Sequence, residues 1–329
     1  MSKPRILVAR AAFPEVIARL EQHLDVESNQ ADEVWDKATL IQKLKGKQGV
    51  VTTAGDLIDA DVIRACPDLK ICSNSAVGFN NFDIDAMTAA GVLATNAPDV
   101  LTETTADFGF ALLMAAARRI AEGEHFLRAG KWSRWSYDML SGYDIHGSTL
   151  GILGMGRIGQ GIAKRGAHGF GMKVIYHNRS RLDASLEAEC KASYVSKPEL
   201  LERSDHLVLV LPYSPASHHT IGAAELAMMK PTATLVNIAR GGVVDDAALA
   251  AALREGRIAA AGLDVYEGEP KVHPDLLAIP NVVLTPHIAS ATRPTRLAMI
   301  NLAADNIIAF LGGKSPLSPV NPEVLAGRT

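Results

Sequence analysis

The sequence predicts an α/β protein built from two doubly wound parallel-sheet domains. Short apolar runs of strand length alternate with segments of helical periodicity along the chain, which is typical of parallel sheets covered by helices. A chain of 329 residues, 48% hydrophobic and 21% charged, is long enough for two such domains. A glycine-rich turn with the spacing G-x-G-x-x-G follows one apolar run directly and indicates a βαβ unit in the second domain.

Composition and charge exclude several classes of partner. The formal net charge is −3 and no basic run is longer than Arg118-Arg119, which argues against a nucleic-acid partner. The longest apolar run, residues 108–117, is too short to span a bilayer, and the N-terminus lacks an apolar signal segment. Three cysteines without a C-x-x-C pair indicate neither a disulfide framework nor a zinc site. We therefore expect a cytoplasmic protein with no metal and no membrane partner.

The alternation of apolar runs and helical patterns in the first part of the chain predicts a small parallel sheet. Strands are expected at residues 5–8, 50–51, 69–72 and 92–95, and helices at 14–23, 39–44, 59–65 and 83–90. Asn96-Ala97-Pro98 breaks this alternation. A long apolar helix is then expected over residues 102–120, with the Thr102 hydroxyl as its cap and Glu103 in its first turn.

The apolar runs from residue 150 onward predict the strands of a second sheet. They are expected at residues 150–153, 173–177, 207–211, 234–238, 260–265 and 282–284. A last helix, about residues 294–311, ends at Gly312-Gly313. Because the first sheet lacks one helix if both its faces are covered, this helix is expected to return to it. The predicted domains are therefore 1–101 with 288–329, and 102–287, with a cleft at the hinge.

The glycine-rich turn predicts a dinucleotide site. Gly154 permits the tight turn, Gly156 lets a pyrophosphate approach the backbone, and Gly159 lets helix and strand pack closely. The helix N-terminus that follows presents free N–H groups to the phosphates. A glycine-rich turn without a ligand is the alternative, but strand, helix and strand within one short unit favour the dinucleotide.

The end of the strand at residues 173–177 bears on the choice of dinucleotide. A carboxylate at this place selects the ribose 2′-hydroxyl of NAD, whereas a 2′-phosphate needs cations. The sequence continues Asn178-Arg179-Ser180-Arg181, and the first acid is Asp183. NADP(H) is therefore expected as the preferred cofactor, with NAD(H) possible. In the alternative reading, the arginines belong only to a solvated loop.

Three polar residues follow strands of the second sheet and could carry out chemistry. Arg240 follows the strand at 234–238, Glu269 the one at 260–265, and His287 the one at 282–284. Ligands of open α/β sheets lie at the carboxyl ends of strands. A carbonyl that accepts hydride needs a cation and a proton donor, which Arg and a carboxylate-backed His supply. Taken one at a time, each residue has a simpler alternative role: Arg240 as a surface charge, Glu269 as part of a turn, and His287 as a cap of the following segment. His218-His219 and His273 lie in loops and are expected to lack a comparable partner.

Six motifs in order carry a resemblance to a known family. They are SAVGFNNFDIDA (75–86), NAPDVLTETTAD (96–107), LGILGMGRIG (150–159), NIARGGVVDD (237–246), AGLDVYEGEP (261–270) and TPHIASAT (285–292). Over essentially its full length the chain resembles the D-2-hydroxyacid dehydrogenases, most closely the glyoxylate/hydroxypyruvate reductases, including bacterial enzymes that also reduce 2-ketogluconate. The resemblance implies a Rossmann nucleotide-binding domain and a flavodoxin-like substrate domain.

The resemblance also implies roles for individual residues. Arg240 would bind the substrate carboxylate and keto oxygen, His287 would be the acid/base, and Glu269 would orient His287. The implied cofactor residues are Thr105, Gly154, Gly156, Arg157, Ile158, Gly159, Asn178, Arg179, Ser180, Arg181, Pro212, Ile238, Ala239, Asp264 and Ala289. The implied substrate residues are Val77, Gly78, Arg240, His287 and Ser290. Asp264 would meet the nicotinamide amide, or would only cap a strand end. Ala289, where glycine is usual, and Asn80-Asn81 depart from the common family pattern.

The implied activity is NADPH-preferring reduction of glyoxylate to glycolate and of hydroxypyruvate to D-glycerate. One alternative substrate is 2-ketogluconate or another sugar-derived 2-keto acid. A nicotinamide-sensing, corepressor-like binding module is the alternative of another class. The resemblance further implies a homodimer whose contact includes the region of Trp132 and Trp135, which could instead be an intramolecular anchor.

Overall fold

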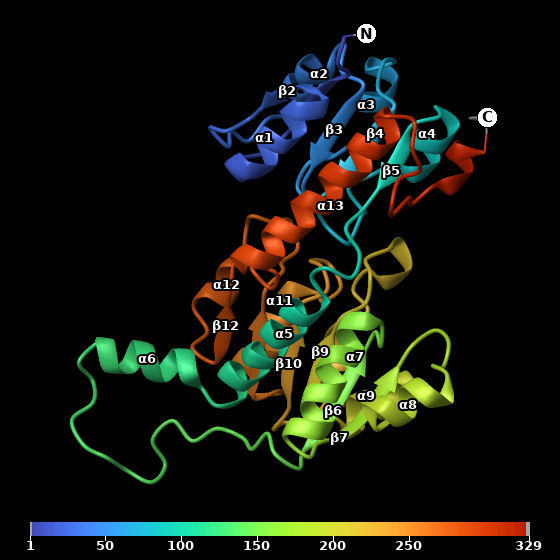
Figure 1. Cartoon of the computed structure of the whole chain (residues 1–329). Coiled ribbons are helices and arrows are strands. Elements are labelled where there is room, and N and C mark those ends of the chain that lie inside the picture. Colours follow the sequence, from blue (N-terminus) through green and yellow to red (C-terminus); the bar gives the residue numbers. More distant parts are fainter. Residues whose placement is uncertain (1, 327–329) are drawn as a thin grey trace. The chain divides into compact units, whose positions relative to one another are not determined.

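The computed structural model describes residues 2–326 as two compact units (Figure 1). One unit joins the chain up to Leu101 to the chain from Ala291 onward, and the other is Thr102–Ser290. The chain thus returns to its first unit, and the second crossing follows Ser290 where the sequence suggested His287. Each unit is a parallel sheet with helices on both faces.

The first unit holds a five-stranded parallel sheet in the order β2-β1-β3-β4-β5, which is the flavodoxin-like order. Its strands are β1 (Arg5–Val8), β2 (Asp25–Ser28), β3 (Gly49–Thr52), β4 (Ile71–Asn74) and β5 (Leu93–Thr95). The sequence analysis missed β2. This strand lies at the sheet edge and is partly exposed, so it has no apolar run to reveal it.

Helices cover both faces of this sheet. They are α1 (Pro14–His23), α2 (Lys37–Leu44), α3 (Ala60–Ala65), α4 (Ile84–Ala89) and α13 (Arg293–Leu311). The terminal helix α13 packs on β3 and β4 beside α1, as expected from the count of helices (Figure 1). Ala303, Ile307 and Phe310 of α13 are buried there with Leu20 of α1 and Ile71 of β4. The other face buries side chains of α2, α3 and α4.

The second unit holds a seven-stranded parallel sheet in the order β12-β11-β10-β9-β6-β7-β8. Its strands are β6 (Thr149–Leu153), β7 (Lys173–His177), β8 (Ala192–Tyr194), β9 (His206–Leu209), β10 (Thr234–Asn237), β11 (Ala260–Leu263) and β12 (Val282–Leu284). This is the doubly wound Rossmann order with β12 added at one edge. The strand order reverses between β6 and β9, so the glycine-rich turn after β6 lies at the switch point, where such sheets bind ligands.

Two helical layers enclose the second sheet. One face buries α5 (Thr102–Ala117), α7 (Arg157–Lys164) with its π-helical extension η1 (Arg165–Gly169), and α8 (Ala184–Cys190). The other face buries α9 (Lys197–Arg203), α10 (Ala223–Met228), α11 (Asp246–Arg254) and α12 (Pro274–Leu277). Short 3-10 turns lie at η2 (Pro215–Ser217) and, in the first unit, η3 (Pro322–Leu325).

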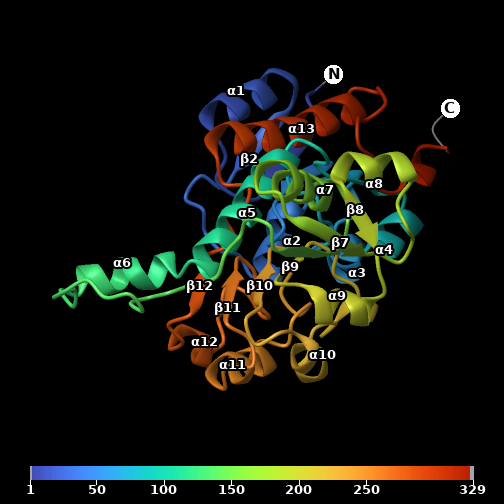
Figure 2. The ribbon, with the colours of Figure 1, turned by 90° about the horizontal axis from the view of Figure 1, so that it is seen from below.

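The long helix after Thr102 is shorter than predicted. It ends at Ala117, Arg119 adopts a left-handed conformation with φ 53°, and a separate helix, α6 (Ile120–Arg128), follows. The Arg119 side chain binds the carboxylate of Glu122 in the first turn of α6. Helix α6 has no buried residue, and with the coil after it extends away from the sheet (Figures 1 and 2). Among residues 2–326, no helix is both long and apolar enough to cross a membrane.

Candidate active site

The glycine-rich turn joins β6 to α7 and leaves its backbone open. Gly154 has φ 102°, and a Cβ there would come within 2.7 Å of the Leu211 backbone nitrogen. A Cβ on Gly159 would meet the Gly154 carbonyl oxygen at 2.4 Å, whereas one on Gly156 would meet nothing within 4 Å. The N-cap of α7 is Gly156, which has no side chain to cap the helix. The turn therefore accepts the close approach of a phosphate, as a dinucleotide requires.

Other predicted cofactor residues line the same carboxyl edge of the second sheet. Asn178 follows β7, and its side-chain oxygen accepts a hydrogen bond from the Met155 N–H at 2.6 Å, which holds the glycine-rich turn. Pro212 follows β9, and the buried Ile238 and Ala239 follow β10. The Thr105 hydroxyl oxygen, in α5, is buried and has no hydrogen-bond partner among residues 2–326. An unsatisfied hydroxyl in this set fits a bound ligand.

The two predicted phosphate-binding arginines differ in their surroundings. Arg181 donates from Nε and Nη2 to the two carboxylate oxygens of Glu187 at 2.8 and 2.7 Å. Tyr176 also donates to Glu187, and these bonds, Arg181 foremost, lower the pKa of the Glu187 carboxyl to about 2. Arg179 is exposed and pairs with no described residue. The sequence reading treated the two arginines as equivalent, but Arg179 alone carries a free cation here.

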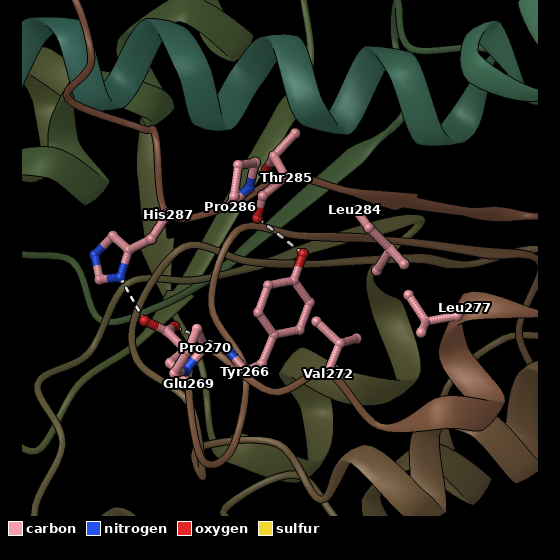
Figure 3. Close-up of a pocket in the computed structure, with 9 residues that line it drawn as sticks. All are labelled: Tyr266, Glu269, Pro270, Val272, Leu277, Leu284, Thr285, Pro286 and His287. Carbon is pink, nitrogen blue, oxygen red and sulfur yellow. Dashed lines mark hydrogen bonds and ion pairs between the residues drawn. The ribbon is translucent and has the colours of Figure 1, made fainter. Parts of the chain in front are cut away.

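Glu269 and His287 form a hydrogen-bonded pair. The Nδ1 atom of His287 lies 2.8 Å from Oε2 of Glu269 (Figure 3). The other carboxylate oxygen accepts the backbone N–H of Tyr266 at 2.9 Å, which fixes the orientation of the carboxylate. The His287 side chain is 40% exposed, so a ligand can reach the ring. The pair can hold a proton at Nδ1 while Nε2 gives one up.

The surroundings keep Glu269 ionised. Burial raises the pKa of its carboxyl, but the hydrogen bond and charge of His287, the Tyr266 N–H and the charge of Arg240 outweigh burial and leave that pKa below its ordinary value. Burial also lowers the pKa of Arg240, and Glu269 opposes that effect. Glu269 is therefore an anion at neutral pH, next to a histidine and a partly buried arginine.

Asp264 holds the segment that carries His287. Its carboxylate accepts the Thr285 hydroxyl at 2.7 Å and the backbone N–H groups of Ile288 and Ala289 at 2.8 Å each. Its carbonyl accepts the His287 N–H at 2.9 Å. These bonds fix His287 in a left-handed backbone conformation, φ 53°, which is uncommon outside glycine. Asp264 thus makes hydrogen bonds of the kind expected from its alternative role as a cap at a strand end.

Arg240 is held against the loop that carries Glu269. The adjacent Gly241 packs so closely that a Cβ there would lie 1.7 Å from the Tyr266 carbonyl oxygen. The Tyr266 hydroxyl bonds the carbonyl oxygens of Leu263 at 3.0 Å and Thr285 at 2.8 Å. The segments after β10, β11 and β12 are therefore tied together, and with them the three predicted catalytic residues.

A cavity of about 300 Å³ adjoins the pair. Glu269 and His287 lie at one end, and apolar side chains of Val272, Leu277 and Leu284 lie at the other (Figure 3). The Tyr266 ring separates them in this view. Ala289 is buried and Ser290 is partly buried just after His287.

The predicted substrate residues Val77 and Gly78 lie in the first unit, in a loop after β4. The Val77 carbonyl accepts the Asn96 side chain at 2.7 Å, and the Gly78 carbonyl accepts Asn74 at 3.0 Å. The buried Asn81 donates to two backbone carbonyls, of Thr53 and Asp56. Asn81, the second residue of the Asn80-Asn81 pair, thus holds this loop in place.

The sequence reading missed a second histidine–carboxylate pair. His219 Nε2 lies 2.9 Å from Oε2 of Glu267, so the expectation that His218-His219 lack a partner was wrong. The Glu267 backbone N–H also donates to Asp246 at 3.1 Å. These residues come together from loops after β9 and β11, and no local spacing in the sequence reveals that contact.

Comparison with known proteins identifies the family. Residues 110–289 match the model of the D-isomer specific 2-hydroxyacid dehydrogenase NAD binding domain. The chain belongs to this family. It is 47% identical to a glyoxylate reductase of Thermococcus onnurineus, covering 98% of this chain and 97% of that protein. It is 48% identical to a glyoxylate reductase of Aeropyrum pernix, covering 100% and 99%.

Solved structures agree with this assignment. An NADPH-dependent glyoxylate/hydroxypyruvate reductase from Sinorhizobium meliloti, solved with NADP and malonate, superposes with a TM-score of 0.87 at 35% identity, covering 97% of each chain. A glyoxylate reductase from Paecilomyes thermophila gives 0.87 at 32% identity, covering 98% of this chain and 99% of that one. This chain is therefore an NAD(P)-dependent oxidoreductase of the D-2-hydroxyacid dehydrogenase family.

Proposed function

We propose that this enzyme is an NADPH-preferring reductase of small 2-keto acids, converting glyoxylate to glycolate and hydroxypyruvate to D-glycerate. The Glu269–His287 pair, tied to Arg240 at the edge of a sheet with a dinucleotide turn, carries the proposal. The names of the relatives support the choice of substrates: they are glyoxylate reductases of Thermococcus onnurineus and Aeropyrum pernix and a glyoxylate/hydroxypyruvate reductase of Sinorhizobium meliloti.

The proposed mechanism assigns one task to each residue. The nicotinamide, when bound, supplies hydride to C2 of the keto acid. Arg240 binds the carboxylate and stabilises the charge that grows on the keto oxygen. His287 donates its Nε2 proton to that oxygen, so that hydride and proton together convert the carbonyl to an alcohol. Glu269 accepts the Nδ1 hydrogen bond and stabilises the imidazolium before transfer. The peptide N–H groups of Val77 and Gly78 are proposed to bind the substrate carboxylate.

The remaining cofactor residues are proposed to follow the family pattern. Arg157 and Ile158 open α7 beside the glycines, and Ser180 lies between the two arginines after β7. Asp264 still has lone-pair capacity on its carboxylate for the nicotinamide amide, because three donors occupy a group that can accept about four. Ala289 would place a methyl group near the same ring.

A panel of 2-keto acids assayed with NADPH and NADH tests the proposed function. We expect the highest kcat/KM for glyoxylate or hydroxypyruvate with NADPH. A clear preference for 2-ketogluconate would replace these substrates within the same chemistry. Nicotinamide binding without turnover of any 2-keto acid would overturn the enzyme proposal in favour of a sensing module.

Arg179 is predicted to determine the preference for NADPH. Since Arg181 is committed to Glu187, the exposed Arg179 is the cation available to a 2′-phosphate. We expect Arg179→Ala to raise the KM for NADPH and leave that for NADH nearly unchanged. Arg257→Ala, an exposed arginine just before β11 and so at the opposite end of the strands, is the matched control. An unchanged ratio of kcat/KM for the two cofactors in Arg179→Ala would refute this role.

We also propose a homodimer that forms through α6 and the coil after it. The large side chains of Ile120, Leu127, Trp132, Trp135 and Tyr137 are all more than half exposed, a density typical of an interaction surface. Sedimentation velocity at micromolar concentration is expected to show a dimer, and Trp135→Ser with Tyr137→Ser to shift it toward monomer. A fully active wild-type monomer would contradict this. We further propose a reducing, cytoplasmic location, which the three buried and unpaired cysteines support.

A further inference from the structure

A second cluster of ligating side chains lies apart from Arg240 and the Glu269–His287 pair. It comprises His218 and His219, from the loop after β9, and Glu267, from the loop after β11. One ligand atom from each lies within 4.8 Å of the others. His219 Nε2 is 2.9 Å from Oε2 of Glu267, and His218 Nε2 is 4.0 Å from Oε1. Both Nε2 atoms thus face one carboxylate.

The other ring nitrogens face outer partners. His218 Nδ1 lies 3.2 Å from the Tyr213 hydroxyl, and His219 Nδ1 lies 3.9 Å from a carboxylate oxygen of Asp245. Metal-binding histidines commonly use one nitrogen for the metal and the other for a carboxylate or a similar outer partner, which fixes the tautomer. The proposed reaction uses none of these residues.

We propose that His218, His219 and Glu267 bind a divalent transition-metal ion, with zinc as the best match. Two imidazoles and a carboxylate, with an open position for water, form a donor set that zinc accepts at about 2.0–2.2 Å. The two rings stack with centroids 3.8 Å apart, so binding requires His218 to rotate out of the stack. Its side chain is 41% exposed, which leaves room for that rotation.

The bound ion would join two loops that border the active site. The His219 backbone N–H donates to the Gly242 carbonyl at 2.7 Å, two residues after Arg240. Glu267 lies two residues before Glu269, and its N–H is held by Asp246. An ion that binds only the folded arrangement of these loops stabilises it in proportion to the ion's concentration over its Kd. We therefore expect zinc to raise the melting temperature.

Calorimetric titration of the full-length protein with zinc chloride tests the site, independently of the proposed reductase activity. Wild type is expected to bind zinc at this site with micromolar Kd, and His218→Ala and Glu267→Gln to weaken that binding more than about tenfold. His146→Ala, which removes an exposed histidine outside the cluster, is the control and should match wild type. The zinc-dependent rise in melting temperature should disappear in the same two variants.

The catalytic pair is the competing place for the ion, and His287→Ala separates the two. Retention of the zinc affinity in His287→Ala, together with its loss in His218→Ala, supports the proposed cluster. No zinc binding by wild type, or binding that His287→Ala abolishes and His218→Ala leaves intact, overturns it. All variants are compared after their metal-free melting temperatures confirm that they are folded.

Discussion

His287→Ala is expected to lower kcat for glyoxylate reduction by roughly 10²–10⁴-fold across the whole pH range. The variant has no group that can donate a proton to the developing alkoxide, so no pH restores the rate. The dinucleotide turn lies after β6, on a different strand from His287, so the Kd for NADPH should stay close to that of wild type. Initial rates between pH 5 and pH 9, with cofactor binding followed by fluorescence, provide the measurement.

His146→Ala is the matched control for this prediction. His146 is an exposed residue before β6 and lies outside the proposed site. It should retain wild-type kcat. A loss of less than about tenfold in His287→Ala would mean that another group or water donates the proton.

Arg240→Ala is expected to raise KM and lower kcat together. The guanidinium is partly buried and its charge acts on Glu269, so it is placed to bind the substrate carboxylate and to stabilise the alkoxide. Charge-assisted bonds contribute about 1.5–3 kcal/mol each, so kcat/KM should fall roughly 10²-fold or more. Arg240→Lys should recover only part of this because an ammonium lacks the planar fork.

The KM values of the Arg240 variants for the keto acid and for NADPH distinguish loss of substrate binding from loss of the folded structure. If Arg240 binds the carboxylate, the KM for the keto acid rises while the KM for NADPH changes little. Equal losses for both substrates, with a lowered melting temperature, would instead indicate that Arg240 only supports the loops after β10 and β11.

Much of the fold follows from periodicity in the sequence. Both sheets, the glycine-rich turn and the return of α13 to the first unit were predicted because buried parallel strands and their helices carry strong apolar patterns. The edge strands β2 and β8 were missed because their side chains are partly exposed. The break at Arg119 was missed because the left-handed conformation of this residue leaves no mark on the apolar pattern of the sequence.

In the candidate site, too, the residues that follow predicted strands could be identified from the sequence, whereas contacts between loops could not. Arg240, Glu269 and His287 could be chosen from the sequence because each follows a predicted strand, and the structure brings Glu269 and His287 within hydrogen-bonding distance. The pairing of Arg181 with Glu187, and of His219 with Glu267, depends on how loops fold over the sheet edge. No spacing rule in a single sequence specifies such contacts.

The central claim is that Glu269, as an anion, stabilises the protonated form of His287 that donates the proton. The most direct test is the pH–rate profile for glyoxylate reduction by wild type and Glu269→Gln, under conditions where hydride transfer limits the rate. The amide keeps the shape of the carboxylate but removes its charge, so the protonated ring loses its charged hydrogen-bond partner. We predict that the basic limb of the profile moves to lower pH in Glu269→Gln. A basic limb that stays where it is in wild type would contradict the Glu269–His287 pairing as the source of the proton.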